Sequence, residues 1–92
     1  MQQQRFELGQ VVATPHALHA LDEAGQQPEE FLKRHVVGDW GEVDDEDRAE
    51  NEFALSRQLR IMSVYTLKSA VKLWIITEAD RSATTLLLPE DY

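Results

Sequence analysis

The spacing of apolar residues along the chain changes twice, from alternating to helical and back to alternating. Period two is typical of a strand with one buried face, and a spacing of three to four residues is typical of an amphipathic helix. The pattern predicts one strand at residues 6–13, three helices within residues 15–58, and three strands at residues 60–66, 71–78 and 82–88. The order β-α-α-α-β-β-β indicates an α+β fold whose helices pack on an antiparallel β-meander.

The first predicted strand presents Phe6, Leu8 and Val12 on a single face. Gly9 interrupts this run, which indicates a bulge or an edge position. Residues 1–5 carry no such pattern and are expected to be disordered.

The first two predicted helices have local boundary signals. Thr14 is expected to cap the first helix, with Pro15 at its first position, and Gly25 should end it. The second helix begins at Pro28 and ends at Gly38. It has acids in its first turn and bases in its last, which suits the helix dipole.

The third helix is predicted at residues 45–58, with Asp44 as its N-cap and Asp47 returning the second bond of a capping box. Its apolar side is thin and consists of Ala49, Phe53, Ala54 and Leu55. A helix this polar can rest on the fold along one narrow stripe while its other faces contact water.

The last three strands are predicted to form an antiparallel meander whose first hairpin turns at residues 67–70. A register that aligns apolar side chains on one face is expected. That register pairs Thr66 with Val71, Val64 with Leu73, and Met62 with Ile75, and on the other face it pairs Ser63 with Trp74.

The length of 92 residues and the composition, 42% hydrophobic and 28% charged, indicate one globular domain spanning residues 1–92. The absence of Cys excludes disulfides and thiolate metal sites. Because no apolar run approaches the ~18 residues of a membrane helix and no leader pattern precedes the first strand, we expect a cytoplasmic protein that does not enter a membrane.

Negative charge is concentrated in one segment. The net charge of the chain is −8, and residues 39–52 contain eight acids and one base, Arg48, so the remainder of the chain is nearly neutral. Direct binding to nucleic acid is therefore not expected, because it depends on clustered Lys and Arg. A basic surface on another protein is the favoured partner, and a solvated helix face that keeps the protein dispersed is the alternative.

The side chains predicted to bind this partner come from the acidic segment and its single tryptophan. They are Asp39, Trp40, Glu42, Asp45, Glu46, Glu50 and Glu52. Trp40 lies between two glycines, so it could either fill the core or act as an aromatic anchor at the interface.

A second polar cluster follows the strand at residues 71–78. Glu78 as a base, with Arg81 or Lys72 binding phosphate, would give a small enzyme on the plan of the barnase- and RelE-type ribonucleases, by analogy of fold alone. The alternative is purely structural: either Glu78 pairs with Arg81 across the turn, or Asp80 and Ser82 form turn hydrogen bonds.

His16 and His19 lie three residues apart on the first helix, a spacing that can share a metal ion. Nothing nearby completes a ligand set, so two surface histidines are expected. Neither a phosphate-binding loop nor a nucleophile elbow is present. We expect no metal and no cofactor.

Three segments resemble a family of small bacterial proteins that are borne on plasmids, phages and integrated elements and have no agreed activity. They are RHVVGDWGEVD at residues 34–44, NEFAL at residues 51–55 and WIITEADRSATTLLLP at residues 74–89. The resemblance covers residues 14–92 and implies a mobile element in a bacterial cell. The chain departs from the family pattern at residues 67–70, where relatives tend to carry a Gly-containing turn.

Together these features predict a non-enzymatic protein of a mobile element that binds a basic protein partner through its acidic surface. Its concrete form would be an antirestriction-like inhibitor of a defence protein, which occupies a nucleic-acid-binding site by mimicking the charge of nucleic acid. A ribonuclease of the toxin type and an accessory subunit without activity of its own are the alternatives.

Overall fold

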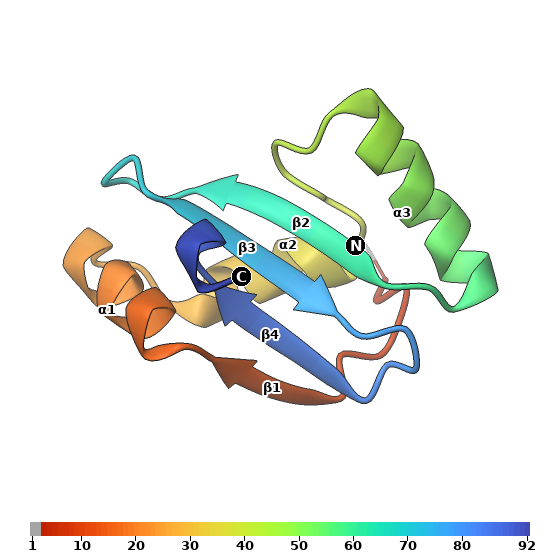
Figure 1. Cartoon of the computed structure of the whole chain (residues 1–92), viewed down its shortest axis with the longest axis horizontal. Coiled ribbons are helices and arrows are strands. Elements are labelled where there is room, and N and C mark those ends of the chain that lie inside the picture. Colours follow the sequence, from red (N-terminus) through yellow and green to blue (C-terminus); the bar gives the residue numbers. More distant parts are fainter. Residues whose placement is uncertain (1–2) are drawn as a thin grey trace.

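Residues 3–92, the part of the chain that the computed structural model describes, fold into four strands, three α-helices and a short 3-10 helix (Figure 1). In chain order the elements are β1 (Gln10–Ala13), α1 (Pro15–Ala24), α2 (Pro28–Val36), α3 (Asp45–Arg57), β2 (Ile61–Thr66), β3 (Lys72–Thr77), β4 (Ala83–Leu87) and the 3-10 helix η1 (Pro89–Asp91). The predicted α+β class and the predicted order of elements are confirmed.

The four strands form one mixed sheet in the order β1-β4-β3-β2. β2, β3 and β4 are antiparallel neighbours, as the predicted meander requires. β1 pairs with β4 and runs parallel to it, with Val11 opposite Thr84. The sheet is therefore not purely antiparallel. β2, β3 and β4 form the antiparallel meander, and β1 lies at the far edge as a parallel neighbour of β4.

Local signals set the helix boundaries as predicted. The Thr14 hydroxyl accepts a hydrogen bond from the Ala17 amide at 3.1 Å, and Gly25 ends α1 with a positive φ of 68°. Asp44 caps α3 by accepting the Asp47 amide at 2.8 Å. These contacts involve residues close in sequence, which is why the sequence predicts them.

The first strand is shorter than predicted, because the chain turns at Gly9. This residue has a φ of 65°, and a Cβ placed there would lie 2.4 Å from the backbone oxygen of Arg81. Phe6 is consequently not part of the sheet. Its ring packs 5.1 Å from that of His35 and 6.1 Å from that of Trp40.

The predicted disordered stretch, residues 1–5, is in part ordered. Residues 1 and 2 lie outside the described residues. The Arg5 amide donates to the Val36 carbonyl at 2.8 Å, and its guanidinium forms two hydrogen bonds to Glu52. Arg5 is therefore part of the fold.

The predicted hairpin register is wrong by one residue. The observed pairs are Thr66 with Lys72, Tyr65 with Leu73, Val64 with Trp74, Ser63 with Ile75, Met62 with Ile76, and Ile61 with Thr77. The reason is the connection at residues 67–71, which is closed by the Leu67 amide donating to the Val71 carbonyl at 2.8 Å and by Ala70 at a φ of 73°. A shift of one residue exchanges the two faces of a strand, so Tyr65 and Ser63 face the core in place of Val64 and Met62.

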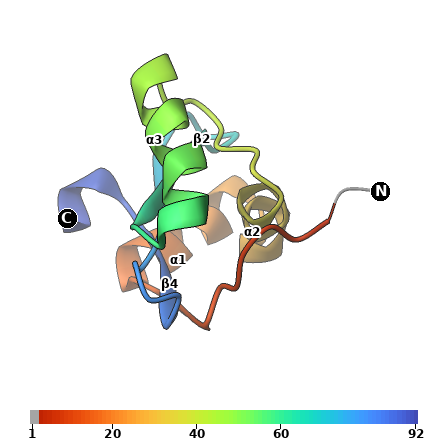
Figure 2. The same cartoon turned by 90° about the vertical axis from the view of Figure 1, so that its right-hand side faces the viewer.

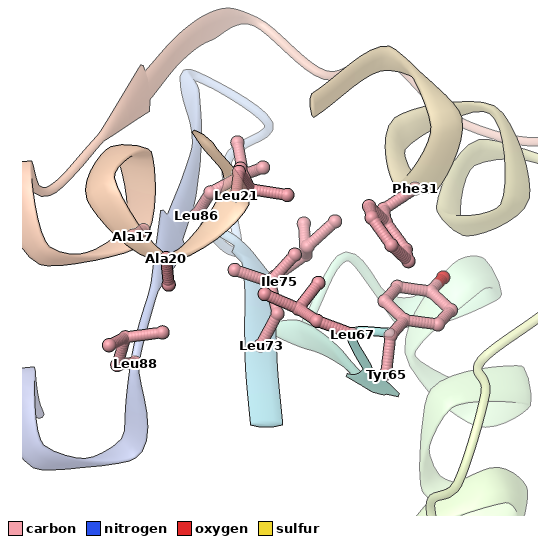
Figure 3. Packing of buried hydrophobic residues seen from close by; sticks show 10 residues of the cluster. All are labelled: Ala17, Ala20, Leu21, Phe31, Tyr65, Leu67, Leu73, Ile75, Leu86 and Leu88. Carbon is pink, nitrogen blue, oxygen red and sulfur yellow. The ribbon is translucent and has the colours of Figure 1, made fainter. Parts of the chain in front are cut away.

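The main core lies between the sheet and the helices α1 and α2 (Figure 3). Its buried members are Ala17, Ala20, Leu21, Phe31, Tyr65, Leu67, Leu73, Ile75, Leu86 and Leu88. Figure 2 shows α2 on one side of the sheet and η1 on the other, while α3 stands beside the β2 edge. Each large apolar side chain buried in this way contributes about 1.5–3 kcal/mol, so this layer supplies most of the stabilisation.

A second cluster attaches α3 to the sheet. It consists of the buried residues Trp40, Val43, Ala54 and Ile61, with Phe6, Leu55 and Val64 packed against them. Only Asn51 and Ala54 are buried among the residues of α3. The helix therefore rests on β2 along a narrow stripe, but not the predicted one: Ala54 and Leu55 pack inward, whereas Ala49 and Phe53 are exposed and the polar Asn51 is buried in their stead.

A buried histidine connects α2 to the sheet. His35 is fully buried, and its Nδ1 and Nε2 atoms lie 2.6 Å from the Ser63 hydroxyl and 2.9 Å from the Thr77 hydroxyl. Thr77 bonds to the Thr84 hydroxyl at 2.8 Å, which donates to the Leu8 carbonyl at 2.7 Å. Burial lowers the pKa of His35 to about 3, so the imidazole is neutral near pH 7.

The edge of the sheet at β2 is closed by side-chain and loop groups. The Asn51 amide donates to the Met62 carbonyl at 2.8 Å and accepts from the Met62 amide at 3.2 Å. Two residues further along β2, the Val64 amide donates to the Trp40 carbonyl, and the Val64 carbonyl accepts a hydrogen bond from the Glu42 amide. These bonds occupy the positions that a neighbouring strand would fill, so they block pairing at this edge.

We expect acid to destabilise the fold through His35. In the unfolded chain this imidazole binds a proton near pH 6.5, whereas in the folded chain it does so only near its lowered pKa of about 3. The unfolded state therefore binds more protons as pH falls below 6.5, and the free energy of unfolding should fall by up to about 1.4 kcal/mol per pH unit. Urea denaturation at pH 7, 6 and 5 measures this slope.

The variant His35→Gln should be less stable at pH 7 and should lose most of the slope between pH 7 and 5. The matched control is His19→Gln, because it removes an exposed imidazole of the same size and should cost much less stability at pH 7. A wild-type stability that is flat over this range would contradict the prediction.

The two hydrogen bonds of the Asn51 side-chain amide should contribute more to the free energy of unfolding than the size of the side chain indicates. Replacement by Leu keeps the volume similar but leaves the Met62 amide and carbonyl without partners, at a cost of about 2–3 kcal/mol in the free energy of unfolding. Asn51→Asp keeps an acceptor for the Met62 amide and should cost less. Equal stability of wild type and Asn51→Leu in urea would show that the edge is satisfied in another way.

Candidate functional site

The acidic segment, residues 39–52, forms the connection between α2 and α3 and most of α3 itself (Figure 1). The connection runs beside β2, and α3 stands above that edge in both views. The carboxylates therefore occupy one end of the molecule, away from β1. They fall into two groups that differ in their partners.

Three of the predicted partner-binding acids form ion pairs within the chain. Asp39 lies 2.7 Å from Nε of Arg34, Glu42 lies 2.6 Å from Nζ of Lys72, and Glu52 lies 2.8 Å from Nη2 of Arg5. In each case the hydrogen bond from the basic partner is the main reason that the pKa of the carboxyl group is lowered. Because these pairs are about half exposed, each contributes little to stability, but their carboxylates are already engaged within the chain.

The acids in the first two turns of α3 have no such partner. Asp45, Glu46, Asp47 and Glu50 are exposed, and none of them forms an ion pair with any of residues 3–92. Three of the four were predicted to bind a partner. Their carboxylates project from one rigid helix into solvent, which leaves them available to cations.

Asp47 is the one acid of these four that the sequence assigns to helix capping and not to partner binding. A capping box would turn its carboxylate back to the amide of Asp44. In the structure the Asp47 backbone amide bonds to Asp44, and its carboxylate is exposed without a partner among the described residues. A local pattern could not reveal this, because both arrangements use the same residues.

Trp40 does not belong to any binding surface. Its exposed fraction is 0%, its ring packs on Phe6 and His35, and its Nε1 atom donates to Glu52 at 3.1 Å. The prediction that Trp40 contacts a partner is therefore wrong. The reason is the second core cluster, which needs a large side chain to fill the space between α3 and β2.

Of the two groups predicted to bind phosphate beside Glu78, Lys72 is not brought near it. Lys72 begins β3, and Glu78 follows its other end, so their backbones lie roughly 20 Å apart at about 3.3 Å per residue. Lys72 pairs with Glu42, and Glu78 lies 3.6 Å from Nη2 of Arg60. A base and a phosphate-binding group on one substrate would need to be much closer.

Arg81 has a structural role. Its guanidinium donates to the Ala54 carbonyl at 3.0 Å and to the Leu59 carbonyl at 2.7 Å, and two weaker bonds reach the carbonyls of Glu78 and Ala79. It therefore joins the C-terminal end of α3 to the turn between β3 and β4. Burial lowers the pKa of this guanidinium, which still remains a cation at neutral pH.

The turn itself agrees with the structural alternative. Asp80 accepts the Ser82 amide at 3.0 Å, as predicted for a turn hydrogen bond. The predicted pair between Glu78 and Arg81 is not formed, because Arg81 faces backbone carbonyls and Glu78 faces Arg60.

The two histidines of α1 are surface residues, as predicted. His16 lies 2.6 Å from Asp91, and His19 lies 3.3 Å from Glu23. Within residues 3–92 no three His, Asp or Glu side chains are arranged to hold a metal ion.

Comparison of the chain with known proteins gives no match. No family model, no curated protein and no solved structure is significantly similar to this chain. None of the helices in residues 3–92 has the length and apolar character needed to cross a membrane.

The structural roles of Arg81 and Lys72 predict that replacing each by Ala lowers the free energy of unfolding by a different amount. Arg81→Ala should lower the free energy of unfolding by about 2 kcal/mol, because hydrogen bonds from a charged donor to several carbonyls are lost. Lys72→Ala removes an exposed ion pair and should cost less than about 1 kcal/mol. Urea denaturation measures both, and equal costs would contradict the structural role of Arg81.

Proposed function

We propose that this chain is a binding protein without catalytic activity, which attaches to a basic surface of another protein through the carboxylates of α3. The observation that supports this most directly is the division of the acidic segment. Asp39, Glu42 and Glu52 form ion pairs within the chain, whereas Asp45, Glu46, Asp47 and Glu50 are exposed without ion-pair partners among the described residues.

Helix stability does not account for all of these charges. Acids in the first turn gain about 0.3–1 kcal/mol each from the helix dipole, and this favours Asp45, Glu46 and Asp47. Glu50 lies beyond the first turn and four residues after Glu46, where like charges repel by about 0.2–0.5 kcal/mol. A tolerated repulsion supports a role for these carboxylates outside the fold.

The setting of this function is part of the proposal. The resemblance to plasmid- and phage-borne proteins suggests the cytoplasm of a bacterium that carries a mobile element. In that setting the basic surface would be the nucleic-acid-binding site of a defence protein, and the carboxylates of α3 would take the place of phosphates. An accessory subunit would use the same surface on a different partner.

A ribonuclease has less support. It requires Glu78 together with Arg81 or Lys72. Lys72 lies at the opposite end of β3 and pairs with Glu42, and the guanidinium of Arg81, although it lies next to Glu78 in the turn, donates to backbone carbonyls. The surface charge of α3 would also repel RNA.

The proposal predicts the effect of neutralising α3. The triple variant Asp45→Asn, Glu46→Gln and Glu50→Gln should remain folded, with a free energy of unfolding within about 2 kcal/mol of wild type, because it loses the dipole interaction of Asp45 and Glu46 but no ion pair with residues 3–92. It should bind its basic partner about tenfold more weakly or worse at low salt. The measurement is capture from a bacterial lysate, followed by titration of the purified partner at low and high salt.

The matched control removes the same charge elsewhere, with Glu7, Glu23 and Glu29 each replaced by Gln. These acids are exposed and lie on the N-terminal segment, α1 and α2. If both triple variants lose affinity equally, net charge and not α3 is responsible. If neither does, α3 is only a solvated surface.

A further inference from the structure

A groove runs along one flank of α3, between this helix and the start of β2. It consists of two adjoining hollows of about 280 and 350 Å³, which share Glu50 and Arg60 in their linings. Hollows of this size lie at the low end of the range for small-molecule sites, so they suit one or two amino-acid side chains.

The apolar part of the groove is its second hollow, whereas the first is lined mainly by polar residues. Phe53 is 52% exposed and Leu59 is 47% exposed, although α3 is otherwise polar. Met62 and Ala54 contribute to the lining of the two hollows. Two large apolar side chains left half in water beside a concave surface are typical of an interaction site.

Carboxylates form the helical rim of this groove. Asp47, Glu50 and Phe53 follow one another at intervals of three residues, which places them along one flank of α3. Asp47 and Glu50 line the first hollow. Asp45 and Glu52 lie on the other flank, where Glu52 contacts Arg5 and Trp40.

The basic residues of the groove are already engaged. Arg60 donates to the Tyr92 hydroxyl at 2.8 Å and lies 3.6 Å from Glu78, and Arg57 lies over the Phe53 ring at 4.9 Å. Arg57 keeps its charge in this contact but does not line either hollow, whereas Asp47 and Glu50 line the first hollow and form no ion pair with residues 3–92. The charge that complements these two carboxylates is positive. An apolar floor with an acidic rim selects a partner that offers both kinds of side chain.

We propose that this groove receives a short basic segment of the protein partner, with an apolar side chain of that segment on Phe53 and Leu59 and its Lys or Arg side chains on Asp47 and Glu50. The inference rests on the proposed function and adds the chemistry of the partner to it. Charge mimicry alone would be insensitive to apolar side chains, whereas binding in the groove requires one.

The test uses two labelled peptides of Lys and Arg that are identical except for their centre, which is two leucines in one and two serines in the other. Their affinities for the full chain are measured by fluorescence anisotropy at low and at physiological salt. The leucine peptide should bind about tenfold more tightly than the serine peptide, and the difference should persist as salt weakens both.

Single substitutions locate the effect. Phe53→Ala should abolish the preference for the leucine peptide, whereas Leu18→Ala, which removes a similarly exposed apolar side chain from α1, should not. Glu50→Gln should weaken binding of the leucine peptide more than Asp45→Asn does, although Asp45→Asn also removes one charge, from the opposite flank of the helix. Thermal unfolding of each variant confirms that it is folded.

The outcomes separate the two proposals. Equal affinity for both peptides, with equal effects of Glu50→Gln and Asp45→Asn, would overturn the groove and leave the acidic surface as the binding site. A leucine preference that survives Phe53→Ala would also overturn the groove. Failure of both peptides to bind at low salt would overturn the proposed function together with this inference.

Discussion

The burial of a neutral imidazole is the constraint on which the rest of this structure depends. His35 ends α2 beneath the sheet, where both ring nitrogens meet hydroxyl groups of β2 and β3. Because an unpartnered polar atom in this position would cost several kcal/mol, the helix can occupy only the place at which Ser63 and Thr77 meet the ring. The bond from Thr77 to Thr84 extends this connection to β4. No buried side-chain nitrogen or oxygen in residues 3–92 is left without a partner.

The position of α2 then decides how the acidic segment is used. The chain leaves the end of α2 beside β2, so Trp40 falls into the space next to the sheet and its carbonyl pairs with Val64. Asn51 continues the closure of this edge from α3. A helix attached by one amide, one tryptophan and a narrow apolar stripe leaves most of its circumference in solvent. That exposure makes α3 suitable for binding.

Ion-paired acids and acids without an ion-pair partner in residues 3–92 thereby occur together within fourteen consecutive residues, 39–52. Asp39, Glu42 and Glu52 bond to Arg34, Lys72 and Arg5, which come from α2, β3 and the N-terminal segment. Asp45, Glu46, Asp47 and Glu50 form no ion pair with any base of residues 3–92. The two groups cannot be distinguished by residue type, because both consist of Asp and Glu in the same run. Only the position of the bases distinguishes them, and two of these bases, Arg5 and Lys72, are distant in sequence from their partners.

The sequence by itself determined the features that depend on neighbouring residues. Thr14, Gly25 and Asp44 set helix ends because a cap needs only the amides or carbonyls of the adjacent turn. The period of apolar residues likewise determined the α+β class. The tertiary structure alone decided the hairpin register, the parallel pairing of β1, the burial of Trp40 and the groove beside α3. These features depend on which distant groups meet. A shift of one residue in a loop exchanges strand faces, and a tryptophan between two glycines has no local preference for core or solvent.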